Sequence, residues 1–147
     1  MARVLISYYS KSGNTEAMAG ILGEAVRAAG AEAIIKRAED TTKADLVAAD
    51  AVAIGSPDYY SYPAGQVKVV FDEALEVKSK LSGKPAVCFA SHGGGGKLKK
   101  PFEDLMKAIG LKLVAPCVLC QEAPAGEAVD EIRRAGKALV GAIGKKG

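Results

Sequence analysis

The sequence predicts an α/β fold in which a parallel sheet of five strands is doubly wound, with helices on both faces. Five short apolar runs rich in β-branched residues recur along the 147 residues, and segments with helical spacing alternate with them. Glycines stand at several boundaries between the two kinds of segment. This alternation indicates parallel strands, because right-handed crossovers between such strands place the helices over the sheet.

The candidate strands are short apolar runs bounded by polar residues or glycine. They cover residues 3–8, 32–36, 51–55, 85–90 and 112–119. Between them, apolar residues three or four positions apart form one helical face in each of four segments. These segments cover residues 18–26, 67–75, 102–109 and 129–143.

The ends of the helical segments are marked by glycine. Gly30, Gly83 and Gly110 each follow a helical segment or precede a strand, where a helix commonly ends in a left-handed residue. The segment 38–50 has weaker periodicity and predicts only a short helix, with Thr41 or Thr42 as its N-cap.

Length and composition indicate one soluble domain that spans residues 1–147. The hydrophobic fraction of 49% and the charged fraction of 25% are those of an ordinary globular protein. No uncharged apolar run approaches the roughly 18 residues that a membrane span needs, and the first residues lack the apolar region of a signal peptide. We therefore expect a cytoplasmic protein with no membrane partner.

The net charge of +3 comes from lysines scattered along the chain, with a local concentration at Lys97, Lys99 and Lys100. This charge is too weak to predict a nucleic-acid partner. The lysines form either a solvated basic face or a surface that docks an acidic protein or a phosphorylated ligand.

The three cysteines do not predict a disulfide framework, because their number is odd and no export signal is present. Cys117 and Cys120 have the C-x-x-C spacing, but they lie in an apolar run that reads as a strand and not at a helix start. Residues three apart on a strand point to opposite faces. We expect buried thiols and assign no metal site.

The first candidate site follows strand 3–8, in a segment that we call the phosphate loop (residues 10–15). Ser10, Ser12 and Thr15 surround Gly13, and the loop runs directly into a helix. Backbone N–H groups, hydroxyls and a helix N-terminus together suit an anion. An ordinary capped turn would need only Ser12 or Asn14, so the surplus of hydroxyls favours phosphate binding. The Walker and dinucleotide glycine patterns are both absent.

The second candidate site is the tyrosine loop (residues 56–63), which follows strand 51–55 and contains three of the five tyrosines. Aromatic rings at the ligand edge of a sheet offer a planar ligand apolar area and stacking faces. The remaining two tyrosines end the first strand, and we expect Tyr8 and Tyr62 to be the ones that serve packing.

The third candidate site is the glycine loop (residues 91–97), which carries four consecutive glycines and the only histidine. Glycines between a strand and a helix let the backbone approach a flat surface closely. His92 has no Ser or Cys motif partner, so we expect it at the edge of the ligand and assign no catalytic residue. In a doubly wound sheet all three loops lie near the carboxyl ends of the strands, where ligands bind. They suit a flat ring with one phosphate tail, such as flavin mononucleotide (FMN).

Ser10-Lys11-Ser12-Gly13-Asn14-Thr15 resembles the phosphate loop of the flavodoxin family, and the order of strands and helices is similar along the whole chain. The resemblance implies a five-stranded sheet in the order 2-1-3-4-5, with the flavin between the first and third strands. It implies that the phosphate loop holds the phosphate and that the other two loops flank the ring. The expected cofactor-binding residues are Ser10, Lys11, Ser12, Gly13, Asn14, Thr15, Ser56, Pro57, Asp58, Tyr59, Tyr60, Ser61, Ser91, His92, Gly93, Gly94 and Gly95.

The resemblance implies an electron-transfer protein that exchanges electrons with a partner protein. The alternative is an NAD(P)H-dependent FMN quinone reductase, whose acceptor is a small quinone-type molecule. Two departures separate the chain from many electron-carrier flavodoxins, because it is basic and has no tryptophan. A flavodoxin-like chain that no longer binds flavin is a further alternative. A phospho-accepting receiver domain is disfavoured, because no carboxylate ends the first strand to accompany Asp58.

Overall fold

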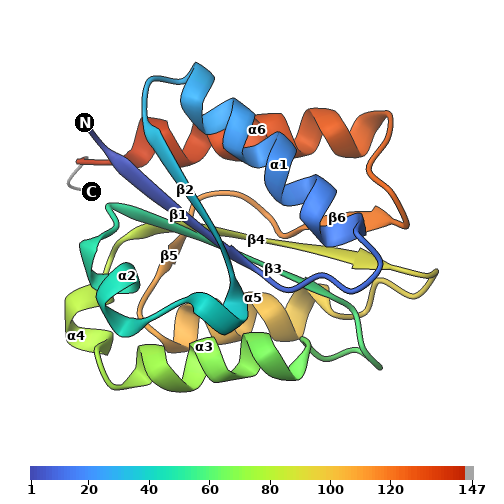
Figure 1. Cartoon of the computed structure of the whole chain (residues 1–147), viewed down its shortest axis with the longest axis horizontal. Helices are drawn as coiled ribbons and strands as arrows, with labels where there is room; N and C mark the ends of the chain where they lie inside the picture. Colours follow the sequence, from blue (N-terminus) through green and yellow to red (C-terminus); the bar gives the residue numbers. More distant parts are fainter. Residues whose placement is uncertain (145–147) are drawn as a thin grey trace.

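The computed structural model describes residues 1–144 and has a parallel sheet between two layers of helices (Figure 1). The strands are β1 (Arg3–Tyr8), β2 (Glu32–Arg37), β3 (Ala51–Pro57), β4 (Pro85–His92), β5 (Lys112–Leu113) and β6 (Val118–Gln121). Their order is β2-β1-β3-β4-β5, and β6 also pairs with β4. Every pairing between these strands is parallel. The predicted fold class and strand order are confirmed.

Seven helical segments lie between or after the strands within residues 1–144. They are α1 (Asn14–Ala28), a 3₁₀ turn (Ala38–Asp40), α2 (Lys43–Ala48), α3 (Gly65–Leu75), α4 (Lys78–Leu81), α5 (Lys99–Ala108) and α6 (Glu127–Ala142). Helices α1 and α6 cover one face of the sheet, and α2 to α5 lie on the other (Figure 1). The four periodic segments are confirmed as helices, whereas α4 and the 3₁₀ turn are too short to show a period. None of these helices is long and apolar enough to cross a membrane.

The predicted strand at residues 112–119 is wrong in its middle, because β5 ends at Leu113 and β6 begins only at Val118. Pro116 lies in the gap and has no N–H with which to continue the ladder. The backbone N–H of Cys117 instead donates to a Glu103 carboxylate oxygen of α5 at 2.8 Å. The sheet therefore has an interrupted fifth strand.

The core consists of two apolar clusters, one on each face of the sheet. Cys117 belongs to one cluster and Cys120 to the other, which confirms that the two thiols point to opposite faces. All three cysteines are free and buried. Gly55 of β3 lies against the ring of Phe89 in β4. The ring occupies the space that a Cβ atom at Gly55 would need.

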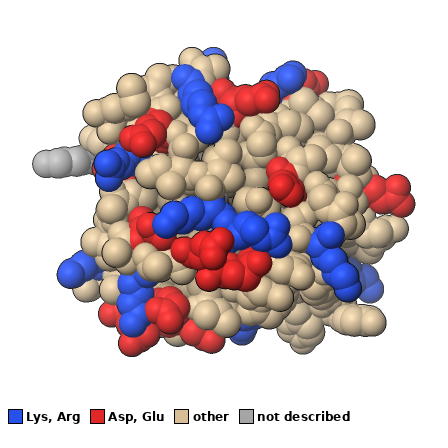
Figure 2. Space-filling model, in the orientation of Figure 1, with Lys and Arg blue, Asp and Glu red and all other residues tan. Residues whose placement is uncertain are grey.

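Acidic and basic side chains are mixed on the face that Figure 2 shows. Several are paired, as where the Lys43 ammonium lies 3.4 Å from a Glu73 carboxylate oxygen and 3.0 Å from a Glu76 carboxylate oxygen.

Thr42 caps α2 in a capping box with Asp45, and Thr42 is one of the two residues expected as the cap. Asp45 also accepts hydrogen bonds from Lys36 at 2.9 and 3.0 Å, so it connects α2 to β2.

The contact between α1 and α6 depends on Gly136. A Cβ atom at this position would lie 2.7 Å from the Cβ of Ala25 and 3.3 Å from Leu22. We expect Gly136→Ala to lower the free energy of unfolding by about 1 to 3 kcal/mol, because the two helices must separate. Urea unfolding monitored by circular dichroism measures the change.

The matched control is Gly141→Ala in the same helix, where, within residues 1–144, nothing beyond the helix's own backbone and the adjacent residues lies within 4 Å of the added Cβ. We expect this variant to be as stable as the parent or about 0.5 kcal/mol more stable, since alanine favours the helix. Equal stabilities for the two variants would contradict close packing at Gly136.

Asp45 is expected to make stability depend on pH. Burial opposes its ionisation, but the hydrogen bonds from Lys36 and Thr42 outweigh burial and keep the pKa of Asp45 below its usual value. Its stabilising effect is therefore complete above the unfolded-state pKa of about 4 and is lost as pH falls through the lower, folded-state pKa. Asp45→Asn should cost about 1 kcal/mol at pH 7.

Urea unfolding at pH 7 and at successively lower pH checks this expectation, and the difference between Asp45→Asn and the parent should disappear in acid. The exposed carboxylate of Asp72 on α3 forms no salt bridge within residues 1–144, so Asp72→Asn is the control. A cost for Asp45→Asn that stays constant down to the lowest pH would show that the carboxylate charge does not matter.

Candidate functional site

The phosphate, tyrosine and glycine loops lie at one edge of the sheet, after the carboxyl ends of β1, β3 and β4 (Figure 1, right). Parallel register brings these ends together, because Tyr8 is the register partner of Gly55 and Pro57 that of Ser91. The backbone N–H of Asp58 donates to the carbonyl of Ser91 at 2.8 Å and so joins the tyrosine loop to the glycine loop. The structure thus brings the three predicted loops together.

The phosphate loop leaves the first turn of α1 open. Gly13 is the N-cap in a left-handed conformation, with φ of 97°, and no side chain caps the helix. Its N–H donates to the Ser10 hydroxyl at 3.1 Å, whereas the N–H groups of Asn14, Thr15 and Glu16 make no hydrogen bond within residues 1–144. Free N–H groups at a helix start attract an anion.

Thr15 and Ser91 connect the phosphate loop to the glycine loop. Their hydroxyls are buried and form a hydrogen bond of 2.7 Å, although the residues lie 76 positions apart in the sequence. This bond fixes the start of α1 relative to the end of β4. Lys11 and Ser12 are exposed at the tip of the loop.

The tyrosine loop is closed by a tight turn. The backbones of Tyr59 and Tyr62 exchange two hydrogen bonds, of 2.9 and 3.0 Å, and the intervening Tyr60 and Ser61 have φ of 56° and 70°. Positive φ is unfavourable for residues other than glycine, so neighbouring contacts must compensate. Asp58 supplies one of them, because its carboxylate accepts from the Ser61 N–H at 2.7 Å.

Asp58 and Ser56 are largely engaged in hydrogen bonds within the protein. The second carboxylate oxygen of Asp58 accepts from the N–H of Leu98 at 3.2 Å, which ties the end of the glycine loop to the tyrosine loop. The fully buried Ser56 hydroxyl donates to the Pro57 carbonyl at 2.7 Å and accepts from the Ala64 N–H at 2.8 Å. Among the predicted site residues, these two shape the loops.

The tyrosines at this edge differ in exposure. Tyr8 is 7% exposed and packs in the core as expected, but Tyr62 is 67% exposed, so its predicted packing role is wrong. Tyr60 is almost fully exposed, at 97%, at the tip of its turn. Burial raises the pKa of Tyr59, with a smaller contribution from Tyr9, so the Tyr59 hydroxyl stays neutral at physiological pH.

A hollow of about 300 Å³ lies between the tyrosine and glycine loops. It is lined by Asp58, Tyr60, Ser61, His92, Gly93, Gly94, Gly95 and Lys97. Within the glycine loop, the N–H of Gly94 donates to His92 Nδ1 at 3.1 Å, which orients the imidazole ring. Gly94 and Gly96 have positive φ, a conformation that side chains disfavour.

Arg37, the last residue of β2, also belongs to this edge, and sequence reasoning missed it. Its guanidinium carbon lies 5.5 Å from the ring centres of Tyr8 and Tyr9, and its Nη2 donates to the carbonyl of Ser10 at 2.9 Å. Arg37 is the register partner of Tyr8, so the strand order places it beside the phosphate loop. In the sequence, the feature that could have identified Arg37 is a basic residue at the end of the strand that pairs with β1.

The described residues fit a ligand with a flat ring and one phosphate. The open helix start beside Gly13 offers unpaired N–H donors, and among residues 1–144 no atom beyond its chain neighbours lies within 4 Å of the position that a Cβ at Gly13 would take. The hollow between the other two loops offers a tyrosine ring and glycine backbone. Both features open at the same edge of the sheet.

Comparison with known proteins identifies the family. The family model for flavodoxin matches residues 6–136. The flavodoxin of Aquifex aeolicus is 36% identical over 98 residues, which cover 65% of this chain and 53% of that protein. An NAD(P)H dehydrogenase (quinone) of Gluconacetobacter diazotrophicus is 37% identical over an alignment of 120 residues, and the match covers 64% of this chain and 60% of that protein. The chain therefore spans just over half the length of these curated relatives.

Among solved structures, the two-electron reduced flavodoxin of Megasphaera elsdenii superposes with a TM-score of 0.83. It is 30% identical, and the match covers 94% of this chain and 98% of that chain. The family model, the relatives and the strand order agree. The chain belongs to the flavodoxin family.

Proposed function

We propose that this protein binds FMN and transfers electrons between the flavin and a partner protein. The observation that carries the proposal is the uncapped start of α1 at Gly13, which opens at the same edge as the tyrosine and glycine loops. Membership of the flavodoxin family supports FMN as the cofactor. Bound FMN supplies reversible one- and two-electron chemistry.

In this proposal the phosphate loop holds the phosphate mainly through neutral donors. The N–H groups of Asn14, Thr15 and Glu16 point out of the helix start, and the exposed Ser12 hydroxyl can add a further hydrogen bond. The Thr15 side chain is engaged with Ser91 and keeps the helix start in place.

The isoalloxazine ring would lie between the tyrosine and glycine loops. Tyr60 offers an aromatic face on one side, and the backbone of Gly93 to Gly95 allows close approach on the other. The hollow is open to solvent, and the exposed ring of Tyr60 adds apolar area to its lining. An open edge of this kind lets a partner approach the ring.

A second function, NAD(P)H-dependent reduction of quinones, is favoured by a specific observation. The chain is 37% identical over 120 residues to a protein named NAD(P)H dehydrogenase (quinone). In this chain, His92 and Lys97 line the hollow and could contact a second, anionic ligand.

Flavin retention tests the first proposal. We expect the purified protein, mixed with FMN and freed of excess ligand, to retain the flavin and to show absorption bands at about 370 and 450 nm. The bands should bleach on chemical reduction and return in air. A protein that retains no flavin would contradict the proposal.

A steady-state assay with NADH or NADPH and a quinone separates the two functions. Sustained oxidation of NADH or NADPH would establish the reductase function, and absence of turnover in a flavin-loaded sample would favour the electron carrier.

The role of Gly13 is tested by comparing two glycines. Gly13 and Gly30 have similar φ values, 97° and 95°, and in the described part of the chain neither has an atom beyond its chain neighbours within 4 Å of an added Cβ. Each substitution to alanine should cost about 1 kcal/mol of stability from backbone strain. Gly13→Ala should also weaken FMN binding about tenfold, since the helix start must shift.

Gly30→Ala is the control, because Gly30 follows the far end of α1, and its FMN affinity should equal that of the parent. Titration of the apoprotein with FMN, followed by flavin fluorescence, gives both affinities. Equal loss of FMN affinity in the two variants would show that strain anywhere in α1, and not the open helix start, controls binding.

A further inference from the structure

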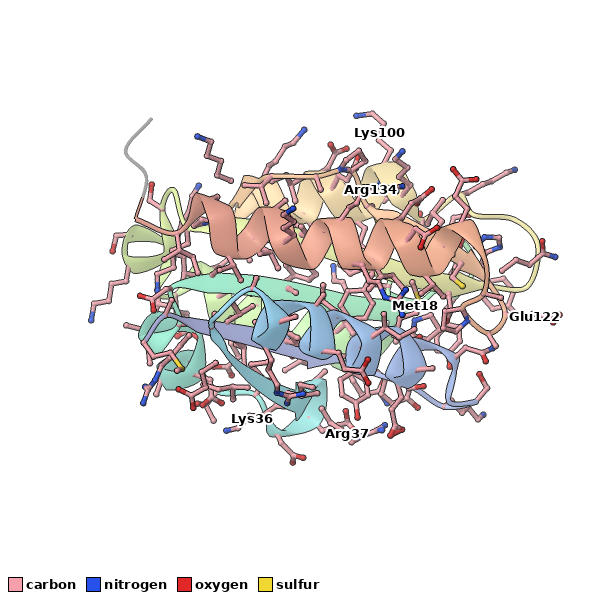
Figure 3. The ribbon with its side chains drawn as sticks, turned by 90° about the horizontal axis from the view of Figure 1, so that it is seen from above. Met18, Lys36, Arg37, Lys100, Glu122 and Arg134 are labelled. Carbon is pink, nitrogen blue, oxygen red and sulfur yellow. The ribbon has the colours of Figure 1, made fainter. Side chains whose placement is uncertain are left out.

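We propose that Arg37, which lies outside the phosphate loop, is a positioning residue that fixes this loop in its phosphate-binding conformation. The inference rests on the proposed binding of FMN and adds a determinant of phosphate recognition on strand β2. Figure 3 shows Arg37 beside Lys36 at the outer edge of the sheet.

The first step is the convergence of contacts from one side chain on three consecutive residues. The Arg37 guanidinium carbon is 5.5 Å from the ring centres of both Tyr8 and Tyr9, and Nη2 donates to the Ser10 carbonyl at 2.9 Å. These residues are the end of β1 and the start of the phosphate loop. One planar group therefore fixes the point at which the chain leaves the sheet.

The second step follows the chain from Ser10 into the helix. The Ser10 hydroxyl accepts from the N–H of Gly13 at 3.1 Å, and Gly13 is the left-handed N-cap of α1. A shift of Ser10 would move the acceptor that keeps the Gly13 N–H in place. The contacts thus run from Arg37 through Ser10 and Gly13 to the N–H groups that face the phosphate.

The third step concerns the charge of Arg37. Its Nε donates to a Glu39 carboxylate oxygen at 3.1 Å, so a neighbouring negative charge offsets the guanidinium and restrains its rotation. Arg37 therefore acts chiefly by directed hydrogen bonds and by cation–π contacts with the two tyrosine rings. Lysine would preserve the charge, but its ammonium lacks the planar fork that serves the Ser10 carbonyl, Glu39 and both rings together.

The fourth step is that the effect should be specific to the phosphate. The residues that line the hollow all come from the tyrosine and glycine loops, and Arg37 is not among them. Loss of Arg37 should weaken the binding of a flavin that carries a phosphate and leave the binding of a flavin without one unchanged. Loss of a residue with only a structural role would weaken the binding of both flavins alike.

The experiment compares FMN with riboflavin, which has the same ring and no phosphate, in buffer without phosphate. Apoprotein variants Arg37→Gln and Arg37→Lys are titrated against each flavin, with flavin fluorescence as the readout. We expect Arg37→Gln to weaken FMN binding about tenfold and to leave riboflavin binding unchanged. Arg37→Lys should recover only part of the FMN affinity.

The matched control is Lys36→Gln, in the adjacent residue of the same strand. Lys36 bonds Asp45 at 2.9 and 3.0 Å, on the side of α2, so this variant removes a charge and an ion pair away from the loop. It should leave the ratio of riboflavin to FMN dissociation constants at the parent value. Urea unfolding of each apoprotein confirms that the variants are folded.

Two failures are distinguishable. If the parent binds FMN but Arg37→Gln and Arg37→Lys leave the ratio of the two dissociation constants unchanged, the positioning role of Arg37 is wrong and the proposed function stands. If the parent binds neither flavin, the proposed function fails and the inference fails with it. An equal loss of affinity for FMN and riboflavin in Arg37→Gln would also overturn the inference, because it would show that the substitution has a general structural effect.

Discussion

Parallel pairing of β1 with β3, and of β3 with β4, is the constraint on which the rest of the structure depends. It places three loops from distant parts of the sequence at one edge, with Tyr8 beside Gly55 and Pro57 beside Ser91. Such pairing requires crossover helices, and these helices bury the two apolar faces of the sheet. The buried bond between the Thr15 and Ser91 hydroxyls is possible only because the strands end together.

Much of this arrangement could be predicted from the sequence, because local patterns carry it. Apolar runs and helical spacing identify the main strands and helices, and hydroxyls around Gly13 identify the phosphate loop. What the sequence did not reveal depends on contacts between distant residues. The break in the fifth strand involves Glu103 of α5 as well as Pro116, and the place of Arg37 depends on the pairing of β2 with β1.

Polar residues in the loops show a related limit of sequence analysis. Ser56 and Asp58 are polar residues of the kind that contact ligands, but much of their hydrogen-bonding capacity is used inside the protein. Tyr62 shows the opposite case, since its side chain is far more exposed than expected. A loop sequence therefore identifies which residues are near a site more readily than which of them face it.

Burial of the cysteines has a consequence for the electron transfer proposed for this protein. Reduced flavins that meet oxygen can generate peroxide, and peroxide reacts with thiolates much faster than with protonated thiols. The adjacent Cys117 thiol and, after it, burial raise the pKa of Cys88, and burial raises the pKa of Cys120. Since all three thiols are shielded from solvent, the fold protects its cysteines from a by-product of the chemistry proposed for it.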